Sequence, residues 1–252
     1  MTTLQGLGIT RRYGGLTAVD GVDIEVTSGE VVALIGPNGA GKTTLFSCLS
    51  GSEPLDAGRV LLDGGELTRL PTEARARRGI GRTFQRLELF ATLSVGDNLL
   101  VGAENRRTSS LVRGLLGAGD RRGSSDRDTV QSVAELLGLA DLLGSLAGTL
   151  PTGTQRLVEL GRALCREPTV LLLDEPASGL DTTETLELQR LLRGLAADGM
   201  AVLLVEHDVD LVLGAADRIY AMDMGRILAS GTPQEVQDNP EVRAAYLERT
   251  AT

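Results

Sequence analysis

The residues best suited to chemistry form a glycine-rich stretch with the spacing of a phosphate-binding loop. Residues 36–43 match the pattern G-x-x-x-x-G-K-S/T, in which glycines let backbone N–H groups curve around a polyphosphate. Lys42 is the single lysine among 25 lysines and arginines, and a compact ammonium suits such a loop better than a broad guanidinium. The expected phosphate-binding residues are Gly36, Pro37, Asn38, Gly39, Ala40, Gly41, Lys42, Thr43 and Thr44.

Three short apolar runs end where the remaining reactive residues begin. They are residues 31–35, 170–173 and 201–205. Such runs are typical of strands buried on both faces of a doubly wound α/β sheet. The first run leads into the phosphate loop, the second into Asp174 and Glu175, and the third toward His207. Ligands bind at the carboxyl ends of such strands, so we expect these groups at one edge of the sheet.

These side chains suggest a division of labour in phosphate chemistry. The Thr43 hydroxyl and the Asp174 carboxylate can hold Mg²⁺, which prefers hard oxygen ligands. Glu175 is then placed to polarise an attacking water, and a neutral His207 to bridge that water and the terminal phosphate. The alternatives are a solvated acidic turn and a structural histidine. The upstream phosphate loop favours the catalytic interpretation.

Composition limits the other classes of function. A net charge of −9, with three Phe, three Tyr and no Trp, argues against a general nucleic-acid binder. The arginines at positions 75, 77, 78, 82 and 86 are better explained as a solvated helix face than as a nucleic-acid patch. Cys48 and Cys165 lack metal-ligand spacing, so we expect two reduced core thiols and no zinc.

The rest of the chain predicts the surrounding elements. Residues 1–30 alternate apolar and polar side chains, as do residues 59–63, which predicts a small antiparallel sheet. Residues 104–128 predict a mobile insertion with one short helix. Thr232 with Glu235 predicts a capped helix, followed by a last helix over about 241–249. No apolar run approaches the roughly 18 residues that span a bilayer, and no signal-peptide pattern is present. We therefore expect a soluble, cytoplasmic protein that reaches a membrane only by docking.

Six motifs in a characteristic order resemble those of the ATP-binding-cassette (ABC) ATPases, over nearly the whole chain. They are Tyr13, the phosphate loop, Gln85 in Thr83-Phe84-Gln85-Arg86, the signature segment (residues 150–155), Asp174-Glu175 with the loop 178–181, and His207. The resemblance implies a phosphate-loop α/β core with an N-terminal antiparallel subdomain and an inserted helical subdomain. It implies one domain over 1–252: core about 1–86 and 155–231, helical subdomain about 87–154, and C-terminal helical tail about 232–252.

The same resemblance implies roles for individual residues toward ATP and Mg²⁺. Tyr13 would stack on adenine, and Gln85 would sense Mg²⁺ and pass movement to a membrane subunit. Lys42, Glu175 and His207 would be catalytic, and Thr43, Gln85 and Asp174 would serve the metal. Asp181 would face the partner subunit, and its spacing to Glu184 also predicts an N-cap.

The signature segment departs from the family pattern Leu-Ser-Gly-Gly-Gln because Pro151 replaces the serine, whose hydroxyl meets the terminal phosphate of ATP on the opposite subunit. Proline offers neither a hydroxyl nor an N–H. Gly153 is kept, and a helix over about 155–165 would still direct its dipole at the phosphate. Either Thr152 or Thr154 can replace the lost donor. Our hypothesis is that the composite site forms but is weaker.

Within the family, residues 82–90, the insertion after Asn98 and the tail 231–247 look most like ATPase subunits of branched-chain amino-acid importers. This implies a second cassette, membrane permease subunits, an indirect solute-binding protein, no nucleic acid, and a place on the inner face of the plasma membrane. Two other classes remain open: a phosphate-loop kinase, and an ATP-gated clamp or assembly ATPase with weak hydrolysis. The solute, the direction of transport and the identity of the second cassette are not encoded in these motifs.

Overall fold

The computed structural model describes residues 1–83, 87–104 and 122–247. The chain divides into two compact units, Met1–Arg82 with Thr169–Thr252, and Thr83–Pro168. Gln85, and the part of the expected insertion from 105 to 121, lie outside the described residues. The second unit ends later than the expected helical subdomain, because the helix after the signature segment packs within it.

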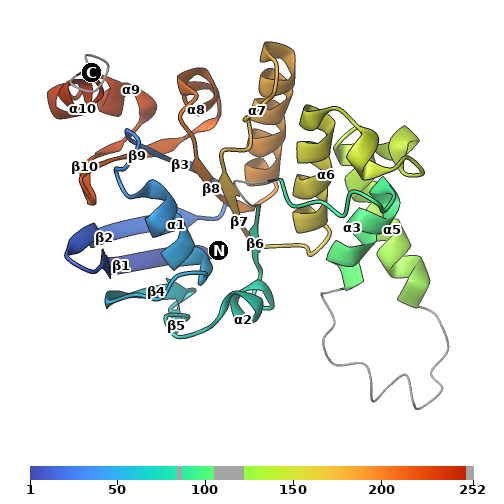
Figure 1. Ribbon diagram of the computed structural model, residues 1–252, viewed down its shortest axis with the longest axis horizontal. Coiled ribbons are helices and arrows are strands. Elements are labelled where there is room, and N and C mark those ends of the chain that lie inside the picture. The colour runs from blue at the N-terminus through green and yellow to red at the C-terminus, as the bar shows by residue number, and fades with distance from the viewer. Residues whose placement is uncertain (84–86, 105–121, 248–252) are drawn as a thin grey trace. The chain divides into compact units, whose positions relative to one another are not determined.

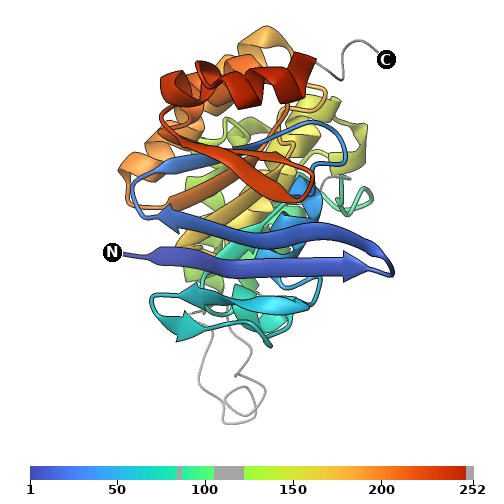
Figure 2. The ribbon, with the colours of Figure 1, turned by 90° about the vertical axis from the view of Figure 1, so that its left-hand side faces the viewer.

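An antiparallel sheet forms the N-terminal part of the first unit (Figure 2). Its order is β2-β1-β4-β5: β1 (Thr3–Tyr13), β2 (Leu16–Thr27), β4 (Ala57–Leu62) and β5 (Gly65–Glu66). In the β1–β2 pairing Leu4 lies opposite Val26, and both side chains are buried. The alternation of apolar residues thus places one face of this sheet on the core, as the sequence predicts.

A six-stranded sheet forms the centre of the same unit. Its order is β10-β9-β3-β8-β7-β6: β10 (Arg226–Gly231), β9 (Arg218–Asp223), β3 (Val31–Ile35), β8 (Ala201–Val205), β7 (Val170–Asp174) and β6 (Ile80–Arg82). Only the β9–β10 pairing is antiparallel. The three predicted strands are confirmed and are direct neighbours, so their carboxyl ends meet at one edge.

Helices cover both faces of this sheet (Figure 1). The helix α1 contacts strands of both sheets, and its Leu45, Phe46 and Leu49 are fully buried between them. The helices of this unit are α1 (Lys42–Ser50), α2 (Thr72–Ala76), α7 (Thr182–Ala197), α8 (Val209–Ala215), α9 (Pro233–Gln237) and α10 (Pro240–Leu247).

Two predicted capping boxes, at Asp181 and Thr232, are confirmed. Cys48 is buried and is not bonded to another cysteine.

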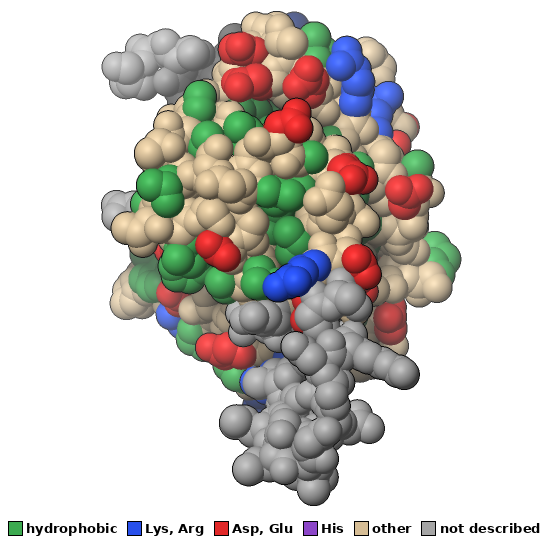
Figure 3. Space-filling view, turned by 90° about the vertical axis from the view of Figure 1, so that its right-hand side faces the viewer, with side chains coloured by type: hydrophobic (Ala, Val, Ile, Leu, Met, Phe, Trp, Pro, Cys, Tyr) green, Lys and Arg blue, Asp and Glu red, His purple; other side chains and the backbone are tan. Residues whose placement is uncertain are grey.

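The second unit is helical. It contains α3 (Val95–Glu104), α5 (Arg122–Leu136), α6 (Thr152–Leu164) and the 3₁₀ turns η1 (Ala140–Leu142) and η2 (Ala147–Thr149). The helix α6 approaches α3 closely, because a Cβ atom at Gly102 would collide with the Arg162 carbonyl oxygen. Phe90 and Leu146 are exposed large hydrophobic residues of this unit. On the face drawn in Figure 3, hydrophobic side chains lie between acidic ones. No described helix is long and apolar enough to cross a bilayer.

One arginine of the expected solvated cluster is instead a core residue. Arg75 in α2 is 1% exposed, and its guanidinium donates to the carbonyl oxygens of Cys48 (2.8 Å) and Leu49 (2.7 Å) at the end of α1. It also donates to the carbonyl oxygens of Leu70 and Thr68. The last carbonyls of a helix lack helical partners and carry partial negative charge, so a cation there satisfies both needs. Burial lowers the pKa of Arg75 to about 10, which leaves it charged at neutral pH.

We expect Arg75→Met to lower the free energy of unfolding by about 2–5 kcal/mol, because it leaves several buried carbonyls without donors. Arg78→Met is the matched control, since Arg78 is exposed and three residues away, and should cost less than about 0.5 kcal/mol. Denaturant titration followed by circular dichroism measures both. Equal losses in the two variants would show that the buried hydrogen bonds do not stabilise the fold.

Candidate active site at the phosphate loop

The phosphate loop joins β3 to α1 in a conformation that only glycine allows at two positions. Gly36 (φ 153°) and Gly41 (φ 103°) have positive φ values, and Cβ atoms there would collide with the carbonyl oxygens of Met222 and Ala18. The helix begins at Lys42, and its first helical bond runs from Leu45 N to Gly41 O (2.9 Å). The N–H groups of residues 42–44 therefore have no helical carbonyl to bond, which makes this end an anion-binding site.

Lys42 is held over the loop by the loop itself. Its Nζ donates to the carbonyl oxygens of Gly36 (2.6 Å) and Pro37 (3.1 Å), and the residue is 8% exposed. Burial lowers the pKa of Lys42, and the charges of Glu175 and Asp174 oppose that shift. An ammonium with little water around it attracts an anion more strongly than a surface lysine does, although the two nearby acids offset part of this attraction.

The structure brings Glu175 and His207 together, as the strand order requires. The Glu175 N–H donates to the Val205 carbonyl oxygen (2.8 Å), which fixes the turn after β7 to the end of β8. Glu175 Oε1 lies 3.8 Å from His207 Nδ1. Glu175 has φ 49°, a left-handed backbone that costs free energy in a residue with a Cβ atom. The charge of Glu175 acts to raise the pKa of Lys42, so the two side chains lie within electrostatic reach of each other.

Asp174 and Thr43 offer the oxygen ligands expected for Mg²⁺. The Asp174 carboxyl is 4% exposed at the end of β7, and Thr43 lies in the first turn of α1. One carboxylate and one hydroxyl suit Mg²⁺, which keeps several waters and shares the phosphates of its nucleotide. Among the described residues no group of three or more His, Cys, Asp or Glu side chains could form a cage for another metal. The donor set therefore fits Mg²⁺ bound together with a nucleotide.

Burial, with a contribution from Glu175, raises the pKa of Asp174 from 3.8 to about 6. Ionising this carboxyl opposes folding above pH 6, and below pH 3.8 the acid is protonated in both states, so the penalty disappears there. We therefore expect Asp174→Asn to stabilise the nucleotide-free protein by roughly 1–3 kcal/mol near pH 8, with the gain shrinking steadily toward pH 4.

Denaturant midpoints across this pH range test the expectation. Asp198→Asn, an exposed change at the end of α7, should shift stability by less than about 0.5 kcal/mol at every pH. A gain for Asp174→Asn that does not depend on pH would contradict the assigned cause.

The expected adenine platform, Tyr13, is the last residue of β1 and is 44% exposed. One face of the ring is covered by the guanidinium of Arg11, whose Cζ lies 4.6 Å from the ring centroid. Arg11 is held in turn by Glu53 (2.9 Å) and Asp56 (3.5 Å). A guanidinium over one face of the ring helps to hold the ring in place. The sequence did not single out Arg11.

The signature segment begins its helix three residues earlier than predicted. Pro151 is the N-cap of α6, which starts at Thr152 rather than near Gln155. The first helical bond, from Gln155 N to Pro151 O (2.9 Å), leaves the N–H groups of Thr152, Gly153 and Thr154 without helical partners. Pro151 makes no side-chain cap, so the anion-binding end of this helix lacks a side-chain hydroxyl at that position but keeps its backbone donors.

Sequence reasoning overlooked Glu206, which lies at the centre of this edge of the sheet. It is 1% exposed. Its Oε1 accepts from the Ala177 N–H (3.0 Å), and its Oε2 accepts from the N–H groups of His207 (2.8 Å) and Asp208 (3.2 Å). One carboxylate thus joins the turn after Glu175 to the switch loop, which we define as residues 206–208. The sequence did offer a signal: Glu206 directly follows the fully apolar strand β8, and an acid at such a position is buried only when it has hydrogen-bond partners.

We expect Glu206→Gln to lower kcat for ATP hydrolysis by about tenfold to a hundredfold with KM nearly unchanged. The glutamine side chain has one oxygen acceptor where the carboxylate has two, so the two turns lose their common acceptor. Asp208→Asn is the matched control: asparagine caps α8 as well as aspartate does. Steady-state kinetics separates the two parameters. A variant with wild-type kcat, or a loss of folding alone, would show that Glu206 has no positioning role.

The two sheets, the loop-to-helix phosphate site and the acid–histidine pair define a phosphate-loop ATPase with an added helical unit. Residues 19–178 match the family model described as "ABC transporter", and residues 226–247 match one described as "Branched-chain amino acid ATP-binding cassette transporter". The fold agrees with solved cassettes: a nucleotide-free ATP-binding cassette from an ABC transporter superimposes with TM-score 0.86 at 32% identity, covering 98% of this chain and 99% of the other.

Curated relatives agree over almost their whole length. The chain is 41% identical to the high-affinity branched-chain amino acid transport ATP-binding protein BraF of Pseudomonas aeruginosa, with 97% of each chain covered. It is 42% identical to LivG of Escherichia coli, with 95% of each covered, and 36% identical to the lipopolysaccharide export ATP-binding protein LptB of the same species, with 98% covered. The chain belongs to the ABC transporter family, as an ATP-binding subunit.

Proposed function

We propose that the chain hydrolyses ATP in a composite site and that residues 36–44, Glu175 and His207 carry the reaction. The observation that supports the proposal is the row formed by β3, β8 and β7, in which the charge of Glu175 acts on the buried Lys42 and Glu175 Oε1 lies 3.8 Å from His207 Nδ1. The loop N–H groups and Lys42 bind the phosphates, and Tyr13 stacks on the base. Thr43 and Asp174, with Gln85, serve Mg²⁺, which supplies positive charge at the phosphates when bound.

In the proposed reaction, water attacks the terminal phosphorus and the bond to the bridging oxygen of ADP breaks. Glu175 accepts the proton of the water, and His207 orients that water against the terminal phosphate. Lys42 compensates the negative charge that builds on the phosphate oxygens. The products are ADP and phosphate.

We infer that the site is completed by a second cassette. The open N–H groups at residues 152–154 form an anion-binding helix end in the second unit. In the proposed dimer these groups, with the hydroxyl of Thr152 or Thr154, meet the terminal phosphate of ATP held by the partner, and Asp181 lies near the boundary. ATP binding then closes the pair and hydrolysis reopens it.

The proposed transport role is import of branched-chain or related amino acids. Similarity to BraF and LivG supports this, as does the family match over residues 226–247. The partners would be membrane permease subunits and, indirectly, a solute-binding protein, with the cassette on the inner face of the plasma membrane. Exposed Phe90, Leu93 and Leu146 of the second unit offer apolar surface for docking on a permease.

Pro151 favours a second candidate, an ATP-gated clamp with weak hydrolysis. A helix end without the side-chain hydroxyl could still bind phosphate through its backbone and turn over slowly. The acid–histidine pair supports the motor instead. The two candidates differ in the turnover of the unmodified protein.

We expect Glu175→Gln to lower ATP turnover by about a hundredfold to ten-thousandfold and to prolong ATP-dependent dimers, because the amide cannot accept the proton of water. Phosphate release and size-exclusion chromatography with Mg²⁺ and ATP measure the two effects. Glu187→Gln, an exposed change on α7, is the control. Equal turnover in the unmodified protein and Glu175→Gln would favour the clamp, and ATP-dependent phosphorylation of an added small molecule would favour a kinase.

A further inference from the structure

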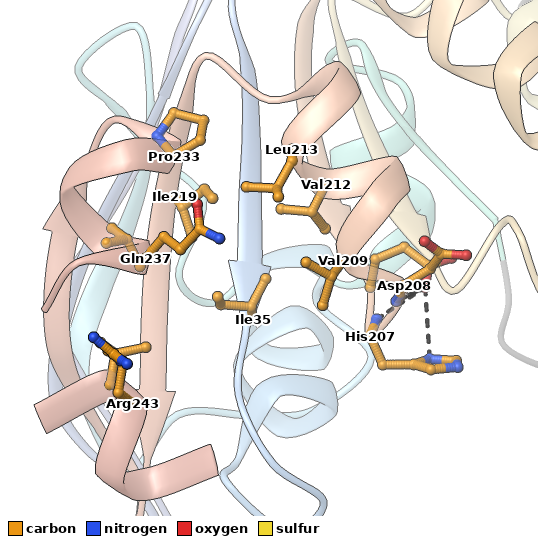
Figure 4. A pocket seen from close by; sticks show the side chains of 13 residues that line it. Ile35, His207, Asp208, Val209, Val212, Leu213, Ile219, Pro233, Gln237 and Arg243 are labelled. Atoms are coloured by element: carbon orange, nitrogen blue, oxygen red, sulfur yellow. Dashed lines mark hydrogen bonds and ion pairs between the residues drawn. The ribbon is translucent and has the colours of Figure 1, made fainter. Parts of the chain in front are cut away.

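A pocket of about 170 Å³ lies in the first unit, directly behind the switch loop (Figure 4). Its floor is formed by Ile35 at the end of β3 and Ile219 of β9, one wall by α8, and the other by α9 and α10. The lining includes the branched side chains of Val212, Val236 and Val242. An apolar cavity of about 150 Å³ stays dry and accepts a molecule as large as benzene, so this pocket can hold a small aliphatic group.

The rim of the pocket carries a cation. Arg243 and Gln237 lie on the side formed by α9 and α10, and Asp208 lies across the pocket from them (Figure 4). In the part of the chain that the structure describes, the Arg243 side chain is exposed and makes no ion pair, while the Asp208 carboxylate is committed to capping α8. An apolar interior with one available guanidinium is complementary to an aliphatic chain that ends in a carboxylate.

We propose that this pocket binds a small branched aliphatic carboxylate, of the class that includes the branched-chain amino acids and their 2-oxo acids, and that its occupancy slows ATP hydrolysis. The branched group fills the space between Ile35, Val212 and Val236, and the carboxylate pairs with Arg243. Binding at the pocket stands on the geometry alone. The effect on hydrolysis rests on the proposed catalytic roles of Glu175 and His207.

One covalent connection and one hydrogen bond link the pocket to the active site. Ile35 on the floor is followed directly by Gly36, the first residue of the phosphate loop. All three residues of the switch loop line the pocket, and its Glu206 also holds the N–H of Ala177, two residues after Glu175. A ligand packed behind this loop therefore restrains both partners of the acid–histidine pair.

The direction of the effect follows from the observed distance. His207 Nδ1 lies 3.5 Å from Glu206 Oε2 and 3.8 Å from Glu175 Oε1. The imidazole therefore rests against the carboxylate of its own loop, and it has to turn away from Glu206 to orient a water beside Glu175. A ligand that fills the pocket stabilises the arrangement described and opposes that movement. It should lower kcat and leave ATP binding at the phosphate loop nearly unchanged.

Binding is tested by isothermal titration calorimetry on the full chain without nucleotide. The probes are leucine, 4-methyl-2-oxopentanoate, the uncharged 4-methylpentan-1-ol, and acetate. We expect saturable binding of at least one of the two branched acids and none of acetate, and the tighter branched acid identifies the source of the ligand. No saturable binding of either branched acid overturns the site, and an alcohol that binds as tightly as the acids overturns the role of Arg243.

Matched variants locate the binding. Arg243→Gln should weaken the acid about tenfold, whereas Arg193→Gln, an exposed arginine of α7 outside the pocket, should not. Val209→Trp fills the mouth from a position that is 57% exposed, so the protein should fold and binding should be lost; Leu186→Trp, 44% exposed on α7, is its control. Unchanged binding in Val209→Trp overturns the location.

The regulatory step is tested by ATP turnover at saturating ligand. We expect kcat to fall about fivefold with KM for ATP within about twofold, and the effect to vanish in Val209→Trp. Binding without any change in kcat overturns the regulation and leaves the ATPase proposal intact. Absence of turnover without ligand overturns the ATPase proposal, while the calorimetric result still decides the site.

Discussion

The backbone pairing of three adjacent parallel strands is the constraint on which the site depends. The strands β3, β8 and β7 are hydrogen-bonded in register, with Leu34 opposite Val205 and Val205 opposite Asp174. Each strand delivers one functional group at its carboxyl end: the phosphate loop, the switch loop, and the Asp174–Glu175 turn. A slip of one residue in either pairing would turn a buried strand over and remove its group from the row.

Burial and backbone hydrogen bonds stabilise or destabilise the charged side chains at this edge of the sheet. Burial lowers the pKa of Lys42 and raises the pKa of Asp174, so each shift favours the neutral form of its group. The site without ligand therefore favours a ligand that brings both phosphate charge and a divalent cation. Glu206 is treated differently, because backbone N–H groups satisfy both of its oxygens. The same buried edge thus contains Asp174, whose pKa is raised, and Glu206, which connects two turns and lies 3.5 Å from His207 Nδ1.

The sequence was sufficient for the elements whose signal is local. The three apolar strands, the two capping boxes and the phosphate loop depend on neighbouring residues, and each was predicted at or near its observed place. The roles of Arg75 and Arg11 were not predictable, because each arginine acts through groups far along the chain: the end of α1 for Arg75, and Glu53 and Asp56 for Arg11. The start of α6 was expected near residue 155, but the helix begins directly after Pro151, because at an N-cap the missing N–H of proline costs the helix nothing.

The close approach of Gly41 to the carbonyl of Ala18 has a consequence for nucleotide selection. The contact leaves no room for a side chain and ties the start of α1 to the hairpin whose other strand ends in Tyr13. Tyr13, the proposed base platform, and the phosphate loop are therefore held at a fixed distance from each other. If Tyr13 binds the base as proposed, a molecule contacts both Tyr13 and the loop only when its sugar and phosphates bridge that distance, which would favour a whole nucleoside triphosphate over free polyphosphate or a free base.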